Sequence, residues 1–352
     1  MIIEKAVWGA LTSSFIALYV ASPALAEDLG LTKAEHTPLA CDQTISVKTL
    51  STFDAPKAKK RYKIELSIPS FANPYIQAVV YGAQKAAADA GVTLTFDAGQ
   101  GFMDPASQIT QLENALTRHP DAVLINPADP DALSASIDEA IADGTMVMDL
   151  GTLSNSTKSF KLVQDDYGQG VMAADALAKL LPRGGAGILM GGPANASWAR
   201  RRVAGFIDEI KKYPSLKISA MTSEDIKPEE GLRKFANAAQ AHPGIDWIYS
   251  AGWFLLPPTS IPSEYRKAVY VAGGFASVTS DALKDGSAAA ILPDFPVGVG
   301  YSGVALAVAK LNGDKVAQHI CAPVAAITKA DLADPIWEKT SNTASGWVPP
   351  TK

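Results

Sequence analysis

The chain has few of the side chains that metal and thiol chemistry require. It contains four histidines and two cysteines among 352 residues. No histidine has metal-ligand spacing with another histidine or a cysteine. No G-x-S-x-G elbow, P-loop or paired-carboxylate motif is present. Gly191-Gly192-Pro193 has the wrong glycine spacing for a dinucleotide fingerprint, and a tight turn is favoured over a phosphate loop there. We therefore expect no cofactor and no metal, and an enzyme is the least favoured function.

Basic charge is also scarce. The chain carries 31 lysines and arginines against 36 acidic residues, for a net charge of −5. The basic residues are scattered, apart from the short run at Lys57–Arg61. This balance argues against non-specific binding to nucleic acid.

Long apolar runs are absent except at the N-terminus. Lys5 precedes an apolar run from Ala6 to Val20, and small residues with a proline follow up to Ala26. This is the pattern of a secretory signal peptide cleaved after Ala26, which predicts a periplasmic protein. The alternative is a membrane anchor, but the run is shorter than the ~20 residues needed to span a bilayer. No cysteine follows the cleavage site, so a lipid-anchored form is disfavoured.

The two cysteines, Cys41 and Cys321, lie near opposite ends of the chain. Export permits a disulfide, which would fasten the N-terminal leader to the region near the C-terminus. The alternative is a pair of buried free thiols. We favour the bridge, although sequence does not establish that the two residues meet.

Residues 27–60 show no clear periodicity, but strands and helices alternate regularly after them. This alternation is typical of an α/β fold with parallel sheets and helices on both faces. The first series is predicted at Lys63–Ile68, Ile76–Ala90, Val92–Phe96, Asp104–Arg118, Ala122–Ile125, Asp131–Asp143 and Met146–Leu150. The second is predicted at Gln169–Leu181, Ala186–Met190, Trp198–Lys211, Lys217–Met221, Pro228–Ala241, Trp247–Ser250, Val269–Ala272, Ala288–Leu292 and Gly300–Leu311.

An internal repeat indicates that the two series are similar halves. In each, a helix ends at His-Pro, at His119 and again at His242. An acidic residue and a short apolar strand follow in both places. His-Pro is a common helix stop, but its recurrence at the same point of two series favours duplication.

Polar and aromatic residues follow the predicted strands. Each alone has a structural explanation as a helix cap or a core residue. In parallel sheets, however, ligands bind outside the carboxyl ends of the strands, and two facing halves would form a cleft. The candidate ligand-binding residues are Phe71, Asn73, Tyr75, Asn126, Asp149, Trp198, Arg202, Trp253, Phe275 and Asp294.

From about Tyr62 to Val324 the chain resembles the periplasmic solute-binding proteins of the ribose-binding type. The matching segments are NPYIQAVVYGAQKAA, AVLINPADPDAL, ARRRVAGF, AAQAHPGID and SDALKDGSAAAI. The resemblance implies two Rossmann-like lobes joined by a three-crossover hinge that closes on the ligand. Lobe 1 would comprise 62–164 and 295–324, and lobe 2 would comprise 165–294 with the tail 325–352, after an extension at 27–61.

The resemblance also implies ligand contacts. Asn73 and Tyr75 match the first-loop contacts of the family, Asn126 the polar residue after the third strand, Arg202 the ligand-binding arginine, and Asp294 lies near the hinge. The chain departs from the sugar-binding pattern at Asp149-Leu150-Gly151, Gly252-Trp253 and Gly273-Gly274-Phe275. There, hydroxyl-binding partners are lost and aromatics appear, which puts a pentose or hexose ligand in doubt.

A narrower resemblance involves the leader ending KAKKRYK, the segment GGPANAS and the tail GWVPP. These look like the periplasmic accessory proteins of trimethylamine N-oxide sensing. The favoured function is therefore a solute receptor for an inner-membrane ABC permease, and the alternative is a co-receptor for a sensor histidine kinase. Tyr75, Trp198, Trp253 and Phe275 would form an aromatic box for a methylated amine or amine oxide, with a polyol or sugar-like solute as the other ligand class.

Overall fold

The computed structural model describes residues 30–101, 103–252, 260–274 and 277–349. The predicted signal peptide at 1–26 and the candidate residues Trp253 and Phe275 lie outside these ranges. Within them, no helix is both long and apolar enough to cross a membrane.

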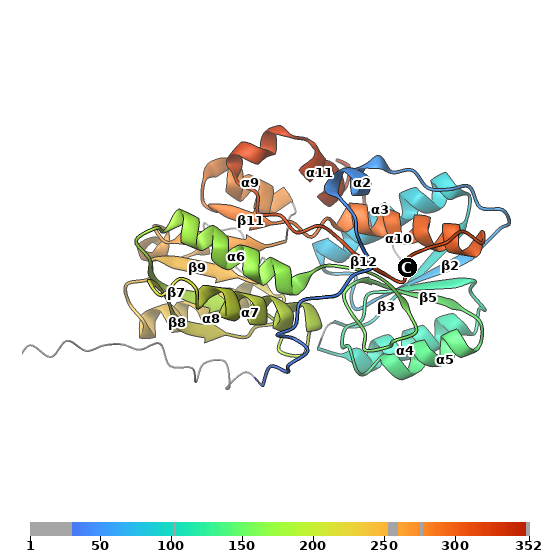
Figure 1. Ribbon diagram of the computed structural model, residues 1–352, viewed down its shortest axis with the longest axis horizontal. Helices are drawn as coiled ribbons and strands as arrows, with labels where there is room; N and C mark the ends of the chain where they lie inside the picture. Colours follow the sequence, from blue (N-terminus) through green and yellow to red (C-terminus); the bar gives the residue numbers. More distant parts are fainter. Residues whose placement is uncertain (1–29, 102, 253–259, 275–276, 350–352) are drawn as a thin grey trace, which may run out of the picture. The chain divides into compact units, whose positions relative to one another are not determined.

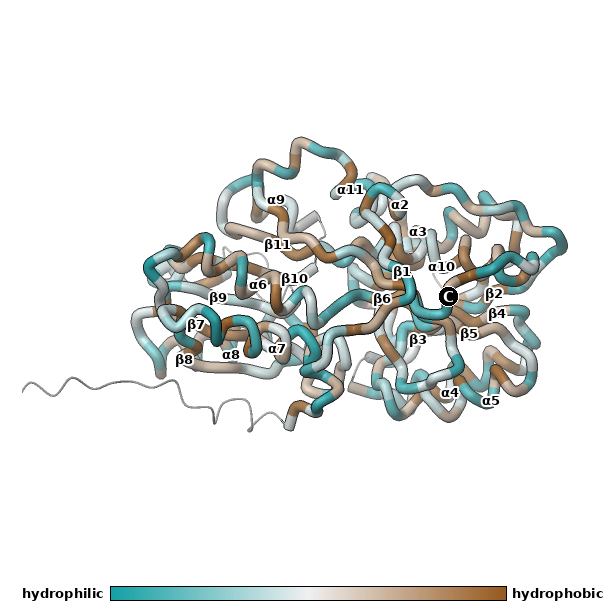
Figure 2. The backbone as a smooth tube through the Cα atoms, in the orientation of Figure 1, coloured by the Kyte–Doolittle hydropathy of each residue, from teal (hydrophilic) through white to brown (hydrophobic). Residues whose placement is uncertain are grey.

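Lobe 1 is built on a seven-stranded parallel sheet in the order β1-β12-β6-β5-β4-β2-β3. Its central strands are buried along almost their whole length, as expected for a sheet covered on both faces. Figure 1 shows α3 and α10 on one face and α4 and α5 on the other, and Figure 2 shows hydrophobic residues concentrated in the central strands and in α10. The strands are β1 (Gln43–Thr44), β2 (Lys63–Ile68), β3 (Thr93–Ala98), β4 (Ala122–Ile125), β5 (Met146–Gly151), β6 (Phe160–Val163) and β12 (His319–Cys321). The helices are α2 (Val47–Thr52), α3 (Pro74–Ala90), α4 (Pro105–Leu116), α5 (Ser134–Ala142), α10 (Pro296–Leu311) and α11 (Ile336–Ser341).

Lobe 2 is built on a five-stranded parallel sheet in the order β11-β10-β9-β7-β8. The strands are β7 (Gly185–Met190), β8 (Leu216–Thr222), β9 (Trp247–Ser250), β10 (Val269–Gly273) and β11 (Ala290–Leu292). The helices are α6 (Asp166–Leu180), α7 (Ser197–Ile210), α8 (Pro228–Ala241) and α9 (Ser277–Asp285).

The two lobes share one packing device, a helix pair brought into close contact by glycines. In lobe 1, a Cβ on Gly82 of α3 would lie 2.1 Å from a backbone oxygen of α10, and one on Gly300 of α10 would lie 2.0 Å from a backbone oxygen of α3. In lobe 2, a Cβ on Gly170 of α6 would lie 2.0 Å from a backbone oxygen of α7, and one on Gly205 of α7 would lie 2.1 Å from a backbone oxygen of α6. Only glycine permits such backbone approach, and the shared device agrees with the repeat predicted from sequence.

The N-terminal leader connects the lobes as a strap, defined here as residues 31–44. At one end it lies on α7, where Arg201 donates Nη1 to the carbonyl of Ala34 and Nη2 to that of Thr37, both at 2.8 Å. Glu35 pairs with Arg200, and His36 Nδ1 lies 2.8 Å from Asp208 Oδ2.

At its other end the strap joins lobe 1. Strand β1 pairs with β12, and Cys41 is joined to Cys321 in a disulfide whose Cα atoms are 5.8 Å apart. The bridge favoured from sequence is therefore present, and the leader is an ordered connection between the lobes.

The C-terminal tail also contacts both lobes, whereas the sequence assigned it to lobe 2. Ile327 bridges to Ile291 of β11 in lobe 2. Trp337 packs against the core of lobe 1, and the Trp347 ring lies 5.5 Å from that of Tyr81 on α3. Strap and tail thus supplement the crossovers that follow β6 and β11.

Candidate functional site

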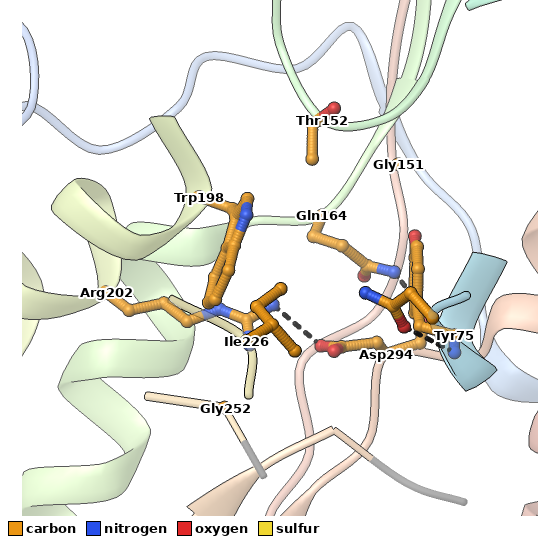
Figure 3. A pocket seen from close by; sticks show the side chains of 10 residues that line it. Tyr75, Gly151, Thr152, Gln164, Trp198, Arg202, Ile226, Gly252 and Asp294 are labelled. Carbon is orange, nitrogen blue, oxygen red and sulfur yellow. Dashed lines mark hydrogen bonds and ion pairs between the residues drawn. The ribbon is translucent and has the colours of Figure 1, made fainter. Parts of the chain in front are cut away.

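A cavity lies between the lobes (Figure 3). Its empty volume, including the open solvent at its mouth, is about 470 Å³. Lobe 1 lines it from the loops after β2 and β5, and lobe 2 lines it from α7 and the loops after β8 and β9. The crossovers contribute the rest. The lining residues are Asn73, Tyr75, Gly151, Thr152, Gln164, Trp198, Arg202, Ile226, Gly252 and Asp294. The predicted residues brought together here are Asn73, Tyr75, Trp198, Arg202 and Asp294.

The start of α3 presents Asn73 and Tyr75 to the cavity. Asn73 caps the helix, because its Oδ1 accepts from the backbone N–H of Tyr75 at 2.8 Å, and Pro74 occupies the first turn. The Tyr75 hydroxyl lies against Gly151, where a Cβ would be only 2.3 Å from it. Burial, together with the charges of Asp294 and Asp166, raises the pKa of Tyr75, so the phenol stays neutral.

Arg202 of α7 is the centre of the polar network. Its Nε donates to Asp166 Oδ1 at 2.9 Å, its Nη1 to the carbonyl of Ala251 at 2.8 Å, and its Nη2 to Asp294 Oδ1 at 2.8 Å. Gln169 donates to the same Asp294 oxygen at 2.8 Å. Asp166 begins α6 and Asp294 follows β11, so one guanidinium ties α7 to both crossover segments.

The network is almost completely buried. Arg202, Asp166 and Asp294 are 3%, 1% and 7% exposed. Burial raises the pKa of Asp166 to about 6, with Arg202 opposing and Asp294 adding to the shift. For Arg202 burial acts to lower the pKa, but the two carboxylates outweigh it and the pKa is raised, so the guanidinium stays charged.

Trp198 and Ile226 supply the apolar walls. The Arg202 guanidinium carbon lies 5.0 Å from the Trp198 ring centroid, a cation–π distance that fixes the indole beside the ion pairs. The cavity therefore combines an aromatic surface with a few oriented polar groups, as small-molecule sites do.

Gln164 adds an acceptor that the sequence did not suggest. Its Nε2 donates to the backbone carbonyl of Asp294, while its Oε1 is buried and has no hydrogen-bond partner among the residues that the structure describes. A buried acceptor without a partner is costly, so Oε1 is poised to accept from a bound solute.

Gly151, Thr152, Ile226 and Gly252 also line the cavity without having been predicted. Gly151 is the last residue of β5, and the others follow β5, β8 and β9, so a position at a strand end is the signal that could have found them.

Three predicted residues do not line the cavity. Phe71 stacks on Phe96 with ring centroids 5.4 Å apart, as part of the lobe 1 packing. Asn126 is fully buried and donates to the carbonyl of Leu150 at 2.7 Å. These two residues organise the loops behind the cavity.

Asp149, also fully buried, holds lobe 1 together instead of facing solute. Its Oδ2 accepts from the Lys161 ammonium at 2.7 Å and from the backbone N–H and hydroxyl of Ser154 at 2.7 and 2.8 Å. Its Oδ1 has no partner among the described residues, but Asp149 does not line the cavity, so its carboxylate serves the packing of lobe 1.

Comparisons with known proteins agree with this architecture. The family model described as a periplasmic binding protein domain matches residues 64–315. The chain is 28% identical to the ribose import binding protein of Bacillus subtilis over 269 residues, which is 76% of this chain and 87% of the relative. It is 26% identical to that of Escherichia coli over 276 residues, covering 77% and 92%.

Solved structures give the same result. The substrate-binding protein of a sugar ABC transport system from Bordetella parapertussis superposes with a TM-score of 0.79 at 17% identity, covering 85% of this chain and 99% of that one. A carbohydrate transporter solute-binding protein from Agrobacterium radiobacter, in complex with D-arabinose, has a TM-score of 0.74 at 26% identity, covering 81% and 100%.

These relatives are binding proteins of import systems, which confirms the predicted fold and the expectation of a solute-binding protein instead of an enzyme. The narrower resemblance to trimethylamine N-oxide sensing proteins is not shown by them. The family match covers most of the chain, and the two-lobed parallel fold with a cavity between the lobes is the one that it requires. The chain belongs to the periplasmic binding protein family.

Proposed function

We propose that the protein captures a small hydroxyl-rich solute, a sugar or a polyol, between its lobes and delivers it to an inner-membrane ABC importer. The observation that carries this proposal is the cavity itself. It places the Trp198 indole beside Arg202 and Asp294, between two lobes joined at a hinge. Relatives that import ribose and a similar structure holding D-arabinose support the same solute class.

The arrangement suits a polyhydroxylated solute. The apolar face of a sugar ring packs on an aromatic side chain, while its hydroxyls reach charged and amide groups at the ring edge. Contacts from both lobes favour the closed state, and a permease that binds the closed form better than the open form would then recognise the loaded protein.

The four-residue aromatic box for an amine oxide receives less support. Of its members, Tyr75 and Trp198 line the cavity, and Trp198 already contacts Arg202. The other two, Trp253 and Phe275, fall outside the described residues. Hydroxyl recognition therefore fits the described part of the site better than an all-aromatic cage.

The test is a thermal-shift screen of ligand-stripped protein with ribose, arabinose, other sugars, polyols, amines and amine oxides. We expect stabilisation by one or more sugars or polyols. Trp198→Leu should weaken the best of them about tenfold, the effect of losing roughly 1.4 kcal/mol of aromatic contact. Trp347→Leu, which removes an indole from the tail against Tyr81, is the matched control and should bind normally. Stabilisation by amine oxides alone would contradict the proposed solute class.

A second candidate is a co-receptor for a sensor kinase, in which closure changes contacts with a periplasmic sensor domain. The observation in its favour is that the strap and the tail, both outside the matched residues 64–315, add surface to both lobes. Gene neighbourhood distinguishes the two. A permease and an ATPase alongside would favour import, and a histidine kinase with a response regulator would favour sensing.

A further inference from the structure

The ion-pair network at the cavity contains more negative than positive groups. Among the described residues, the charged network at its floor consists of one cation, Arg202, and two carboxylates, Asp166 and Asp294. All three are more than nine-tenths buried. Residues 253–259 and 275–276, which lie outside the described ranges, include no ionisable side chain. The positive charge of Arg201, also on α7, lowers the pKa of Asp166, but its guanidinium donates to carbonyls of the strap and does not line the cavity. The ion-pair network at the cavity therefore contains one more carboxylate than cation.

The cation of this network is already paired with three acceptors. Its three nitrogens donate to Asp166, to the carbonyl of Ala251 and to Asp294. A carboxylate or phosphate entering the cavity would lie beside two like charges and would meet a guanidinium that is already paired with them. Such a group would leave water without gaining a free cationic partner, which is unfavourable in a buried site.

The Tyr75 hydroxyl and the Asn73 amide line the cavity as donors, and the cavity also has acceptors left for a solute. Gln164 Oε1 is buried without a partner among the described residues, and the hydrogen bonds of the Asp294 carboxylate described above all end on Oδ1. Figure 3 shows Asp294, Gln164 and Arg202 lying around the same space. A solute that presents hydrogen-bond donors, as hydroxyl and ammonium groups do, can satisfy these acceptors.

We propose that the cavity selects among hydroxyl-rich solutes by charge, taking a cationic amino-polyol or amino sugar more tightly than its neutral analogue and rejecting the anionic analogue. The inference rests on the proposed function and adds the charge class of the solute. Attraction between an ammonium and a buried carboxylate grows as water is excluded, and the ion pair is strengthened by direct hydrogen bonds.

The test uses three matched probes, ribitol, 1-amino-1-deoxyribitol and D-ribonate, which differ only in the group at one end. Titration calorimetry at about pH 7 keeps the ammonium and the carboxylate both charged. We expect the amino-polyol to bind at least about tenfold more tightly than ribitol, and ribonate at least about tenfold more weakly.

The outcomes separate this inference from the proposed function. If ribitol binds and the amino-polyol binds no better, the charge preference is wrong and the proposed function stands. Binding of ribonate as tight as that of ribitol would also overturn the preference. If none of the three binds, and ribose and arabinose fail as well, both proposals fall.

Variants identify the source of the preference. Asp294→Asn brings the charge count of the network to zero, so the affinity ratio of amino-polyol to ribitol should fall to within about threefold. Asp314→Asn, an exposed aspartate outside the cavity, is the control and should leave the ratio unchanged. Asp166→Asn provides a second neutralisation if Asp294→Asn does not fold, as judged by circular dichroism. An unchanged ratio in the folded neutralised variants would overturn the inference.

Discussion

Removing the Cys41–Cys321 disulfide tests how firmly the strap holds the lobes. The bridge closes a sequence separation of 280 residues. In the chain-entropy description, a loop of this length contributes about 5 to 6 kcal/mol at 25 °C by restricting the unfolded chain. This is an upper limit, because the strap can detach from the folded protein before the lobes unfold. Strand β1 has only two residues, so its pairing with β12 retains the strap weakly once the bridge is gone.

The assay compares wild type with the Cys41→Ser, Cys321→Ser double variant in urea unfolding and in hydrogen exchange of residues 31–44. We expect the free energy of unfolding to fall by several kcal/mol, and at most by about 6 kcal/mol. Amide hydrogens of the strap should exchange faster in the variant than in wild type, by a larger factor than those of the central strands. Reductant should convert wild type to the behaviour of the variant and leave the variant unchanged. If stability and strap exchange are both unaltered, the strap is held by its other contacts and the reasoning fails.

The remaining predictions concern buried charges in each lobe. Lys161→Met leaves Asp149 buried without its cation and should lower the free energy of unfolding in urea by about 3 to 5 kcal/mol. Adding Asp149→Asn should restore much of this loss. The solute affinity of the folded Lys161→Met protein should not change, and a large loss of affinity would mean that Asp149 belongs to the binding site. Burial raises the pKa of Asp166 from 3.8 to about 6, so between these values the folded chain binds the proton more tightly than the unfolded chain. Wild type should therefore lose stability relative to Asp166→Asn as pH rises through that window, by up to about 3 kcal/mol; a difference that stays constant with pH would refute the raised pKa.

The regular part of the fold could be predicted because periodicity and strand ends are local signals. The strands Lys63–Ile68, Ala122–Ile125 and Trp247–Ser250 have the predicted bounds. Strands β6, β12 and β1 were not predicted, since they are short and lie in segments without alternation. Because β6 was not predicted, Gln164, which directly follows that strand and lines the cavity, was not among the predicted site residues.

The site was partly predictable for the same reason. Residues after strands gather at one sheet edge, and that rule found Asn73, Trp198 and Asp294. It failed for Asp149 because the register of β5 against β6 places Lys161 directly beside it, and register is not visible in the sequence. It also could not show that Arg202 is paired with both Asp166 and Asp294, because these partners come from segments far apart along the chain.

The position of β12 has a consequence for the order in which the two lobes can fold. Lobe 2 is formed by one continuous stretch, from α6 to β11, and can close its sheet as soon as that stretch has emerged. The first strands of lobe 1 precede lobe 2 in the sequence, but β1 pairs with β12, so β1 joins the sheet only after β12 has paired with β6. We therefore expect the lobe that emerges first to be completed last. The disulfide of Cys41 can form only after Cys321 has been synthesised. Because the chain has no third cysteine, Cys41 cannot form an incorrect disulfide within its own chain before then.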